Sequence, residues 1–218
     1  MDFSYLLALA FGYLCGSTPF GYLVAKKMGV NILEEGSKNM GATNVSRVLG
    51  KKFGIFVFIL DLAKGAFGVL VAAKLMQNET NNLDLLGLLG GVGAILGHNF
   101  TFWLKFKGGK GIATTSGVLL GLTPWTFLIL ISTWGIVFKI TRYVSIASIL
   151  AAFMMPFIVY FIEDGNPVLV WATAILGGLA IYRHKANIKR LLNGTESKFV
   201  KKDKSKDLSG TGPDNAEK

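Results

Sequence analysis

The sequence predicts an all-α polytopic membrane protein of about seven transmembrane helices, two of them short, with interfacial cytoplasmic loops. Three observations support this fold class. Hydrophobic residues make up 51% of the 218 residues and charged residues 17%, against roughly 25% charged in soluble domains. Several apolar runs are hydrophobic on every face, which disfavours a large soluble helical core. The Lys and Arg residues gather in a few short segments between these runs.

The apolar runs define the expected membrane spans. The first covers residues 3–25 and has no basic residue before it, so it is interpreted as a retained helix and not a cleaved signal peptide. It should bend at Ser17-Thr-Pro-Phe-Gly21, and its other glycines indicate close packing with neighbouring helices. The other runs are residues 53–76, 85–100, 112–138, 144–162 and 167–182.

The distribution of basic residues predicts the orientation. Residues 26–52 contain six Lys or Arg and residues 105–110 contain three. No Lys or Arg occurs in three other connections, at 77–84, 121–126 and 163–166. The positive-inside rule therefore places the basic segments and the C-terminus in the cytoplasm and the N-terminus outside. The run 112–138 must then cross twice, turning at Thr123-Pro124, in two arms of about 12–14 residues that are short for a span.

Composition bounds the remaining possibilities. We expect residues 1–196 to form one integral membrane domain that carries the site, and residues 197–218 to form a disordered basic cytoplasmic tail. The net charge of +10 would suggest nucleic acid in a soluble protein, but the positive-inside bias explains it, so no nucleic-acid partner is predicted. The single Cys15 excludes an intrachain disulfide. Neither a nucleophile elbow nor Cys/His metal spacing occurs, and no metal or cofactor is predicted.

Three polar segments on the cytoplasmic side are the candidate binding elements. The first is Gly36-Ser-Lys-Asn-Met-Gly-Ala-Thr-Asn-Val-Ser-Arg47. Its glycines let the backbone approach a ligand, and its N–H groups, next to a helix start, would form an anion nest. Arg47 can bind two phosphate oxygens. Taken alone, the segment is better explained as a turn followed by a capped amphipathic helix.

The other two segments are weaker evidence for a binding site when taken alone, and the presence of the first segment strengthens them. Phe106-Lys-Gly-Gly-Lys-Gly111 offers glycines and the mobile cation Lys110, but it lacks the spacing of a P-loop and no strand precedes it. His184-Lys-Ala-Asn-Ile-Lys-Arg190 places His184 and Asn187 on one helical face. A basic juxtamembrane helix that contacts lipid headgroups is the simpler alternative for this segment.

Several polar residues also interrupt the apolar spans. Asp61 and Lys64 share a helical face and are expected to pair, either as a structural ion pair or in support of a functional site. His98 is a candidate general base, although a lone interfacial histidine more often has a structural role. Ser145 and Ser148 share a face, which helix packing explains by default.

Together these motifs resemble the bacterial membrane-integral acyl-phosphate:glycerol-3-phosphate acyltransferase family. The resemblance rests on four elements, namely Gly36-Ser-x-Asn-x-Gly-Ala-Thr-Asn-x-x-Arg47, Asp61-x-x-Lys-Gly65, Gly97-His98 leading to Phe106-Lys-Gly-Gly-Lys-Gly-x-Ala-Thr114, and His184-x-x-Asn-Ile-x-Arg-Leu-x-x-Gly-x-Glu196. Two positions depart from the family pattern. Lys38 stands where the family usually has Gly, and Thr101 stands where a Pro is common. Both departures put loop geometry in doubt more than activity.

The resemblance implies an activity and a set of site residues. A fatty acyl group would pass from acyl phosphate to the 1-hydroxyl of glycerol 3-phosphate, giving lysophosphatidic acid and inorganic phosphate in the first step of phospholipid synthesis. It implies a bacterial plasma-membrane enzyme with a cytoplasm-facing site and, as a further partner, the enzyme that supplies acyl phosphate. Glycerol 3-phosphate would be held by Ser37, Arg47, Lys110, Ser145, His184 and Asn187. The acyl-phosphate head would be held by Asn39, Gly41, Ala42, Thr43 and Asn44, with Gly108 and Gly109. The catalytic candidates are Ser37, Arg47, Lys110 and His98.

The sequence leaves the proton acceptor and two rival functions open. The hydroxyl proton would pass either to a phosphate oxygen of a substrate or, in the runner-up scheme, to His98. A small-anion transporter would also have Gly-broken helices and midplane charges, but no inverted repeat is apparent and the polar segments lie on one face. A non-catalytic lipid-binding scaffold is a weaker third alternative.

Overall fold

The computed structural model describes residues 3–75 and 82–199. These residues form ten α-helices and one short 3-10 helix, joined by loops. The elements are α1 (Phe3–Ser17), α2 (Phe20–Lys27), α3 (Ala42–Leu49), α4 (Lys51–Leu75), α5 (Leu83–Asn99), η1 (Phe102–Leu104), α6 (Ile112–Leu122), α7 (Pro124–Thr141), α8 (Val144–Ile162), α9 (Pro167–Arg183) and α10 (Lys185–Leu192).

Seven apolar segments confirm the predicted fold class. Five are long enough to cross a membrane, and they correspond to α1 with α2, α4, α5, α7 and α8, while α6 and α9 are shorter apolar helices. The chain turns between α6 and α7 at Thr123, as predicted. The two arms are not equally short, however, because α6 has 11 residues and α7 has 18. α7 starts with Pro at its first helical position, which favours a helix beginning there.

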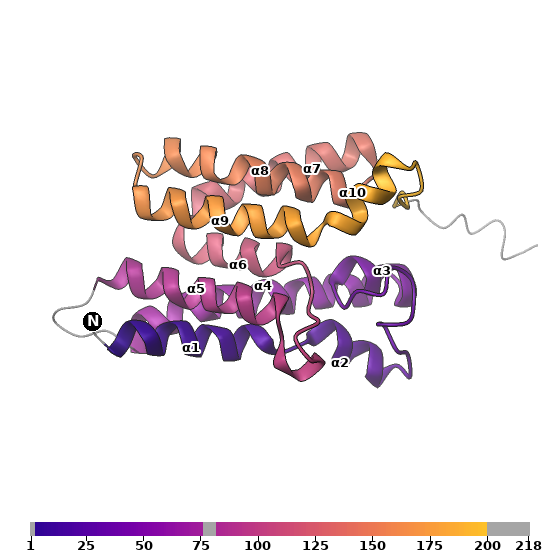
Figure 1. Cartoon of the computed structure of the whole chain (residues 1–218), viewed down its shortest axis with the longest axis horizontal. Helices are drawn as coiled ribbons and strands as arrows, with labels where there is room; N and C mark the ends of the chain where they lie inside the picture. The colour runs from indigo at the N-terminus through magenta and orange to yellow at the C-terminus, as the bar shows by residue number, and fades with distance from the viewer. Residues whose placement is uncertain (1–2, 76–81, 200–218) are drawn as a thin grey trace, which may run out of the picture.

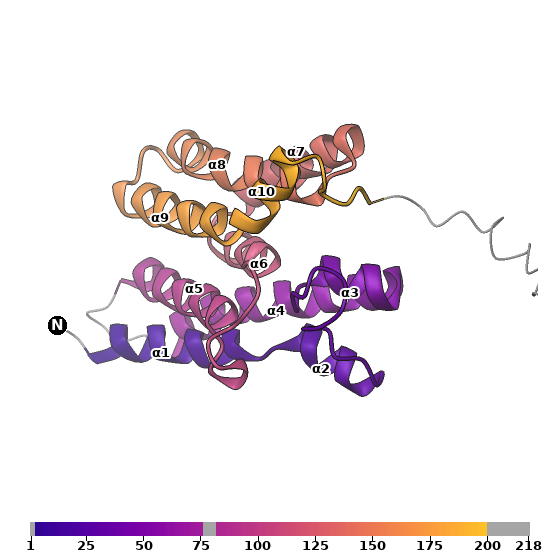
Figure 2. The ribbon, with the colours of Figure 1, turned by 45° about the vertical axis from the view of Figure 1, so that its right-hand side comes forward.

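The helices form two groups with α6 between them (Figures 1 and 2). The first group is α1–α5 and the second is α7–α10. Figure 1 shows α2, α3 and α10 at the end opposite the N-terminus. The predicted polar segments, which are far apart in the sequence, therefore meet at one end of the molecule.

Glycines set the distance between several pairs of packed helices. A Cβ added to Gly12 of α1 would overlap the carbonyl oxygen of Gly90 in α5. A Cβ added to Gly117 of α6 would overlap the carbonyl oxygen of Leu62 in α4. Backbones this close are typical of helix packing in membranes, where small residues form the interfaces. The predicted close packing of the first span is confirmed.

The bend in the first span is stabilised by the predicted ion pair. α1 and α2 are separated by Thr18 and Pro19. The Nζ of Lys64 donates to the carbonyl oxygen of Thr18 at 2.8 Å and lies 2.8 Å from Oδ1 of Asp61. Asp61 and Lys64 are both buried. The pair thus satisfies a backbone group that the bend has removed from the helical ladder.

Both departures from the family pattern are accommodated by the fold. Lys38 has a φ of 54°, in the left-handed region that Gly enters without strain. Its N–H donates to the carbonyl oxygen of Glu35 at 2.9 Å, which closes a turn. Thr101 is fully buried, and its hydroxyl donates to the carbonyl oxygen of Ser17 at 2.5 Å. Thr101 thereby satisfies a carbonyl at the end of α1.

The described residues continue past the predicted domain boundary at residue 196, as far as residue 199. The N–H of Phe199 donates to the carbonyl oxygen of Arg142 at 2.9 Å. The Phe199 ring packs against Phe138 with the centroids 5.9 Å apart. Phe199 therefore packs against α7 and against the loop that follows it. Residues 200–218, together with 76–81 of the predicted outer turn, lie outside the described residues.

Candidate functional site

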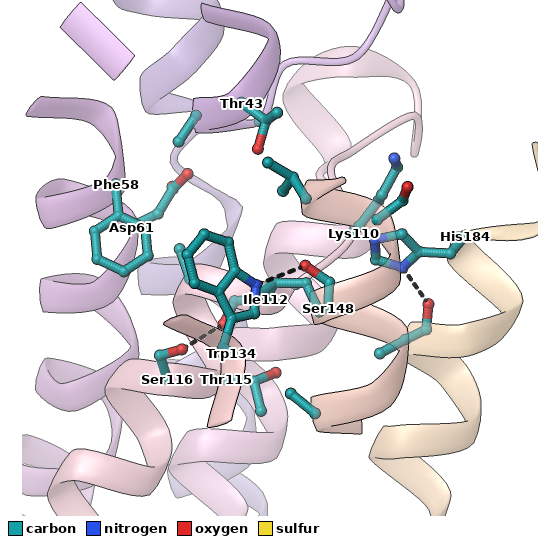
Figure 3. A pocket seen from close by; sticks show the side chains of 18 of the residues that line it. Thr43, Phe58, Asp61, Lys110, Ile112, Thr115, Ser116, Trp134, Ser148 and His184 are labelled. Carbon is teal, nitrogen blue, oxygen red and sulfur yellow. Dashed lines mark hydrogen bonds between the residues drawn. The ribbon is translucent and has the colours of Figure 1, made fainter. Parts of the chain in front are cut away.

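A cavity of about 660 Å³ opens between the two helix groups. It brings together all three predicted polar segments. Eleven of the fourteen predicted site residues line it, namely Ser37, Asn39, Gly41, Ala42, Thr43, Arg47, His98, Lys110, Ser145, His184 and Asn187. Figure 3 shows Lys110 and His184 close together on one side of the cavity, with Asp61 and Phe58 on the other side. The structure therefore brings residues of all three polar segments together around one cavity.

Asn44 is one of the three predicted residues that do not line the cavity. Its buried side chain is used by its own loop, because Oδ1 accepts from the N–H of Ser37 at 2.8 Å. Its Nδ2 donates to three carbonyl oxygens, those of Ile32 at 3.3 Å, Glu35 at 3.0 Å and Asn39 at 2.9 Å. Asn44 therefore holds the loop that presents Ser37 and Asn39 to the cavity.

Gly108 and Gly109 are the other two predicted site residues that do not line the cavity, and they pack against the end of α5. Their N–H groups donate to the carbonyl oxygens of Asn99 and His98, at 3.1 and 3.0 Å respectively. A Cβ on Gly109 would overlap the ring of His98, so only Gly permits this approach. Both N–H groups are therefore already used in hydrogen bonds within the protein. The glycines instead let the loop turn back and direct Lys110 toward the cavity.

Two helix N-termini face the cavity. α3 begins after Gly41 and α6 begins after Gly111, which has a φ of 83°. Neither helix has a side-chain cap, so the N–H groups of its first two residues keep their hydrogen-bonding capacity. The first residues of both helices line the cavity: Ala42 and Thr43, and Ile112 and Ala113. Aligned peptide dipoles make such ends attractive to anions.

A hydrogen-bonded chain of polar side chains covers the same end of the cavity. The Nζ of Lys110 donates to Oδ1 of Asn187 at 2.5 Å, and Nδ2 of Asn187 donates to Oε1 of Glu196 at 2.7 Å. The other oxygen of Glu196 accepts from Nε of Arg190 at 2.6 Å. The Ser145 hydroxyl faces the same carboxylate without completing a hydrogen bond of good geometry. Arg47 also lines the cavity. Together with Lys110 and Arg190 it makes three cations at the polar end, against the one carboxylate of Glu196.

Sequence reasoning did not assign Glu196 to the site. Its side chain is only 6% exposed and it contacts two residues of the third polar segment. The available signal was its place as the last residue of the fourth motif. It was missed because an acidic residue close to a run of lysines is usually a solvated part of a tail.

The charges of the polar end follow from its burial. Burial lowers the pKa of Lys110 to about 8, and the nearby Arg190 and Arg47 lower it while Glu196 opposes them. Burial and the charge of Lys110 lower the pKa of His184 to about 4. His184 is therefore neutral at pH 7. Its Nδ1 lies 2.8 Å from the carbonyl oxygen of Ala180, which fixes the proton there and leaves Nε2 as an acceptor.

His98 is enclosed on both sides of its ring. Its Nδ1 lies 3.5 Å from Oδ1 of Asp61, and Gly109 covers the side that carries Nε2. The residue is 3% exposed, although it forms part of the cavity wall together with Asp61. This environment favours a structural role, because a general base needs a ring nitrogen that can reach the substrate hydroxyl.

The rest of the cavity is largely apolar and is lined by residues of α4, α6, α7 and α8. Trp134 crosses its centre and donates from Nε1 to the Ser148 hydroxyl at 3.1 Å (Figure 3). The apolar lining includes Ile55, Phe58, Leu119, Phe127, Leu130, Ile131, Phe138 and Met155. Within residues 3–75 and 82–199, no group of three or more His, Cys, Asp or Glu is arranged to hold a metal ion.

The fold and the cavity together define a class: a polytopic membrane protein with a cavity that joins a polar, cation-rich end to an apolar groove. Comparison with known proteins makes this specific. The model of the glycerol-3-phosphate acyltransferase family matches residues 6–194. A glycerol-3-phosphate acyltransferase of Fusobacterium nucleatum is 45% identical over 188 residues, covering 86% of this chain and 94% of the relative. That of Aquifex aeolicus is 44% identical over 195 residues, covering 89% and 98%.

Solved structures agree with these relatives. The crystal structure of PlsY (YgiH), an integral membrane glycerol 3-phosphate acyltransferase, in its glycerol 3-phosphate form has a TM-score of 0.82 and 40% identity, covering 90% of this chain and 96% of that chain. Its lysophosphatidic acid form has a TM-score of 0.80. The chain therefore belongs to the glycerol-3-phosphate acyltransferase family and is an integral membrane acyltransferase.

Proposed function

We propose that the chain transfers a fatty acyl group from acyl phosphate to the 1-hydroxyl of glycerol 3-phosphate, releasing lysophosphatidic acid and inorganic phosphate. One observation carries the proposal: a single cavity joins a cationic, N–H-rich end to an apolar groove. Such a cavity can hold two anionic heads and one acyl chain at once. The relatives named for glycerol 3-phosphate and the solved forms with glycerol 3-phosphate and lysophosphatidic acid support the acceptor and the product.

The acceptor is assigned to the side of the cavity that carries Lys110 and Asn187. The two cations Arg47 and Lys110 would bind its phosphate, and Asn187 is already hydrogen-bonded to Lys110 at 2.5 Å. Ser37 and Ser145 add hydroxyl groups to the same wall. The neutral His184 offers its Nε2 as an acceptor, which suits an alcohol donor and would orient the attacking hydroxyl.

The donor head is assigned to the N-termini of α3 and α6. The N–H groups at Ala42, Thr43 and Ile112 would bind the acyl phosphate and the negative charge that develops on the attacked carbonyl oxygen. Asn39 and Gly41 form the edge of this loop; the N–H of Gly41 donates to Oδ1 of Asn39 at 2.8 Å. The acyl chain would extend past Trp134 into the apolar groove.

The reaction needs little from the protein beyond positioning and charge. The acceptor hydroxyl oxygen forms an ester bond with the acyl carbon, and the bond from that carbon to the phosphate oxygen breaks. The hydroxyl proton passes to a phosphate oxygen, so inorganic phosphate leaves with it. Two anions repel each other, and the cationic pocket offsets this repulsion while holding the reacting atoms together. The enclosed ring of His98 favours this scheme over a histidine base.

The activity is tested with purified protein in detergent, acyl phosphate and labelled glycerol 3-phosphate. We expect labelled lysophosphatidic acid and released phosphate in equal amounts. Acyl-coenzyme A and acyl-carrier protein serve as alternative donors. Transfer from either of these with none from acyl phosphate would refute the assigned donor.

Two substitutions separate the roles within the site. Arg47→Ala should abolish transfer while the protein stays assembled, whereas Lys189→Ala, an exposed cation of α10, should leave it within about twofold. His98→Ala tests the runner-up scheme, since a loss well beyond about 10²-fold would indicate a general base. The smaller loss that we expect would reflect only the disturbed packing against Gly109.

A further inference from the structure

Arg183, the last residue of α9, is bound to the backbone of the loop that precedes α6. Its Nε donates to the carbonyl oxygen of Gly109 at 3.0 Å. Its Nη2 donates to the carbonyl oxygens of Gly108 and Gly109, both at 2.8 Å. The guanidinium also lies over the Phe100 ring, 5.4 Å from its centroid. The half-buried side chain is thus directed into the protein.

The contact connects the two helix groups at the polar end of the cavity. Arg183 belongs to the second group, and residues 105–111 continue from α5 of the first group. A second connection lies beside it, because Lys110 of this loop is hydrogen-bonded to Asn187 of α10 at 2.5 Å. The loop is thereby held on two sides, with its carbonyl groups bound by Arg183 and its N–H groups bound to the end of α5.

A basic residue at the end of a span has a simpler explanation, which the geometry does not support. Cations near helix C-termini complement the helix dipole and contact lipid headgroups. Lys185, two residues on, fits this explanation, since it is exposed and its Nζ donates to the Tyr182 hydroxyl at 3.2 Å. Arg183 instead uses its planar fork to bind two consecutive carbonyl groups, which a single ammonium group would not reproduce.

We propose that Arg183 is a positioning residue, which fixes Lys110 and the N-terminus of α6 relative to His184 and Asn187. Arg183 does not line the cavity itself, so it acts through the loop. The inference rests on the proposed function, in which Lys110 binds the acceptor phosphate. Displacements of about 1 Å at such a site lower turnover by roughly 10²-fold.

The test compares Arg183→Ala, Arg183→Lys and the exposed control Lys189→Ala. Transfer rates, acceptor KM and the binding of glycerol 3-phosphate by calorimetry are measured on assembled protein, alongside thermal unfolding. We expect Arg183→Ala to lose about 10- to 100-fold in kcat/KM and to regain part of it when guanidinium ion is added. The kcat/KM of Arg183→Lys should lie between those of Arg183→Ala and the wild type. The kcat/KM of Lys189→Ala should equal that of the wild type.

A double-mutant comparison distinguishes positioning from stability. In a Lys110→Gln background, removing Arg183 should cost less than about threefold in acceptor binding, because the group that it positions has already been lost. An equal loss in both backgrounds, or a normal Arg183→Ala, would overturn the inference. If Arg183→Ala does not assemble, the same comparison is made with Arg183→Lys. If the wild-type protein binds glycerol 3-phosphate but transfers no acyl group, the proposed function is contradicted. The inference about Arg183 is then still tested, because the binding comparison does not need transfer.

Discussion

The pKa of Lys110 makes acceptor binding depend on pH in a defined direction. In the ligand-free site, burial and nearby arginines lower this pKa from 10.5 to about 8. The difference of about 2.5 pH units corresponds to roughly 3 kcal/mol against the charged form. A bound phosphate dianion would oppose both causes and return the pKa toward its ordinary value. Binding of glycerol 3-phosphate should therefore take up a proton at Lys110 above pH 8.

The expected change in acceptor affinity with pH follows from this pKa shift. The acceptor phosphate is already a dianion above pH 7, since the second pKa of phosphate esters is about 6. Affinity should be nearly constant below the pKa of about 8, fall about twofold by pH 8 and about tenfold by pH 9. The stability of the ligand-free protein should change in the opposite direction. Its folded-state pKa lies below the unfolded value, so the penalty for charging Lys110 is relieved as pH rises above 8.

Calorimetric titration with glycerol 3-phosphate at pH 7, 8 and 9, in buffers of different ionisation heat, measures affinity and proton uptake together. Uptake should approach one proton per site at pH 9. Lys110→Gln should bind weakly at every pH and show a flat profile, while Lys189→Ala should follow the wild type. A constant wild-type affinity between pH 7 and 9, or a decline that persists in Lys110→Gln, would refute the reasoning.

Three further predictions concern the fold around the site. Lys38→Gly should stabilise the protein by about 0.5–1 kcal/mol, because the φ of 54° strains a side-chain-bearing residue; an unchanged thermal midpoint in detergent would contradict this. Gly117→Ala should destabilise by at least about 1–3 kcal/mol through overlap with the α4 backbone, whereas Gly135→Ala, which has open space, should be neutral or slightly stabilising. In a background without the native cysteine, Cys at Asp164 should react with an impermeant reagent in intact cells, and Cys at Lys27 only after permeabilisation; the reverse pattern would invert the proposed orientation.

Seven apolar segments could be predicted because the bilayer sets both their composition and their length. The unequal lengths of the two helices in the 112–138 run could not be predicted in this way. α6 lies between the two helix groups, and Gly117 brings it against the backbone of α4, so protein contacts determine where it ends. A length rule derived from lipid thickness does not apply to a helix in that position. Packing against other helices is compatible with the 11 residues of α6.

The candidate site was predictable in its residue types but not in the direction of its side chains. Polar and glycine residues are conspicuous in an apolar sequence, and charge placed them on one side. The pattern does not show that Asn44 faces its own loop, or that the N–H groups of Gly108 and Gly109 bind the end of α5. Arg183 was also overlooked, because basic residues are common at the ends of spans.

Glu196 belongs to a short segment that lines the cavity as far as Phe199. At the polar end, its carboxylate accepts from Asn187 at 2.7 Å and from Arg190 at 2.6 Å, and these hydrogen bonds, opposing the effect of burial, keep its pKa below the usual value. Three residues on, Phe199 packs against Phe138, whose ring lies 5.1 Å from that of Trp134. One short segment therefore contacts both the polar end of the cavity and its apolar groove. This segment shields part of the cavity from solvent, and the lower dielectric there would strengthen the attraction between the cations and the phosphate of the proposed acceptor.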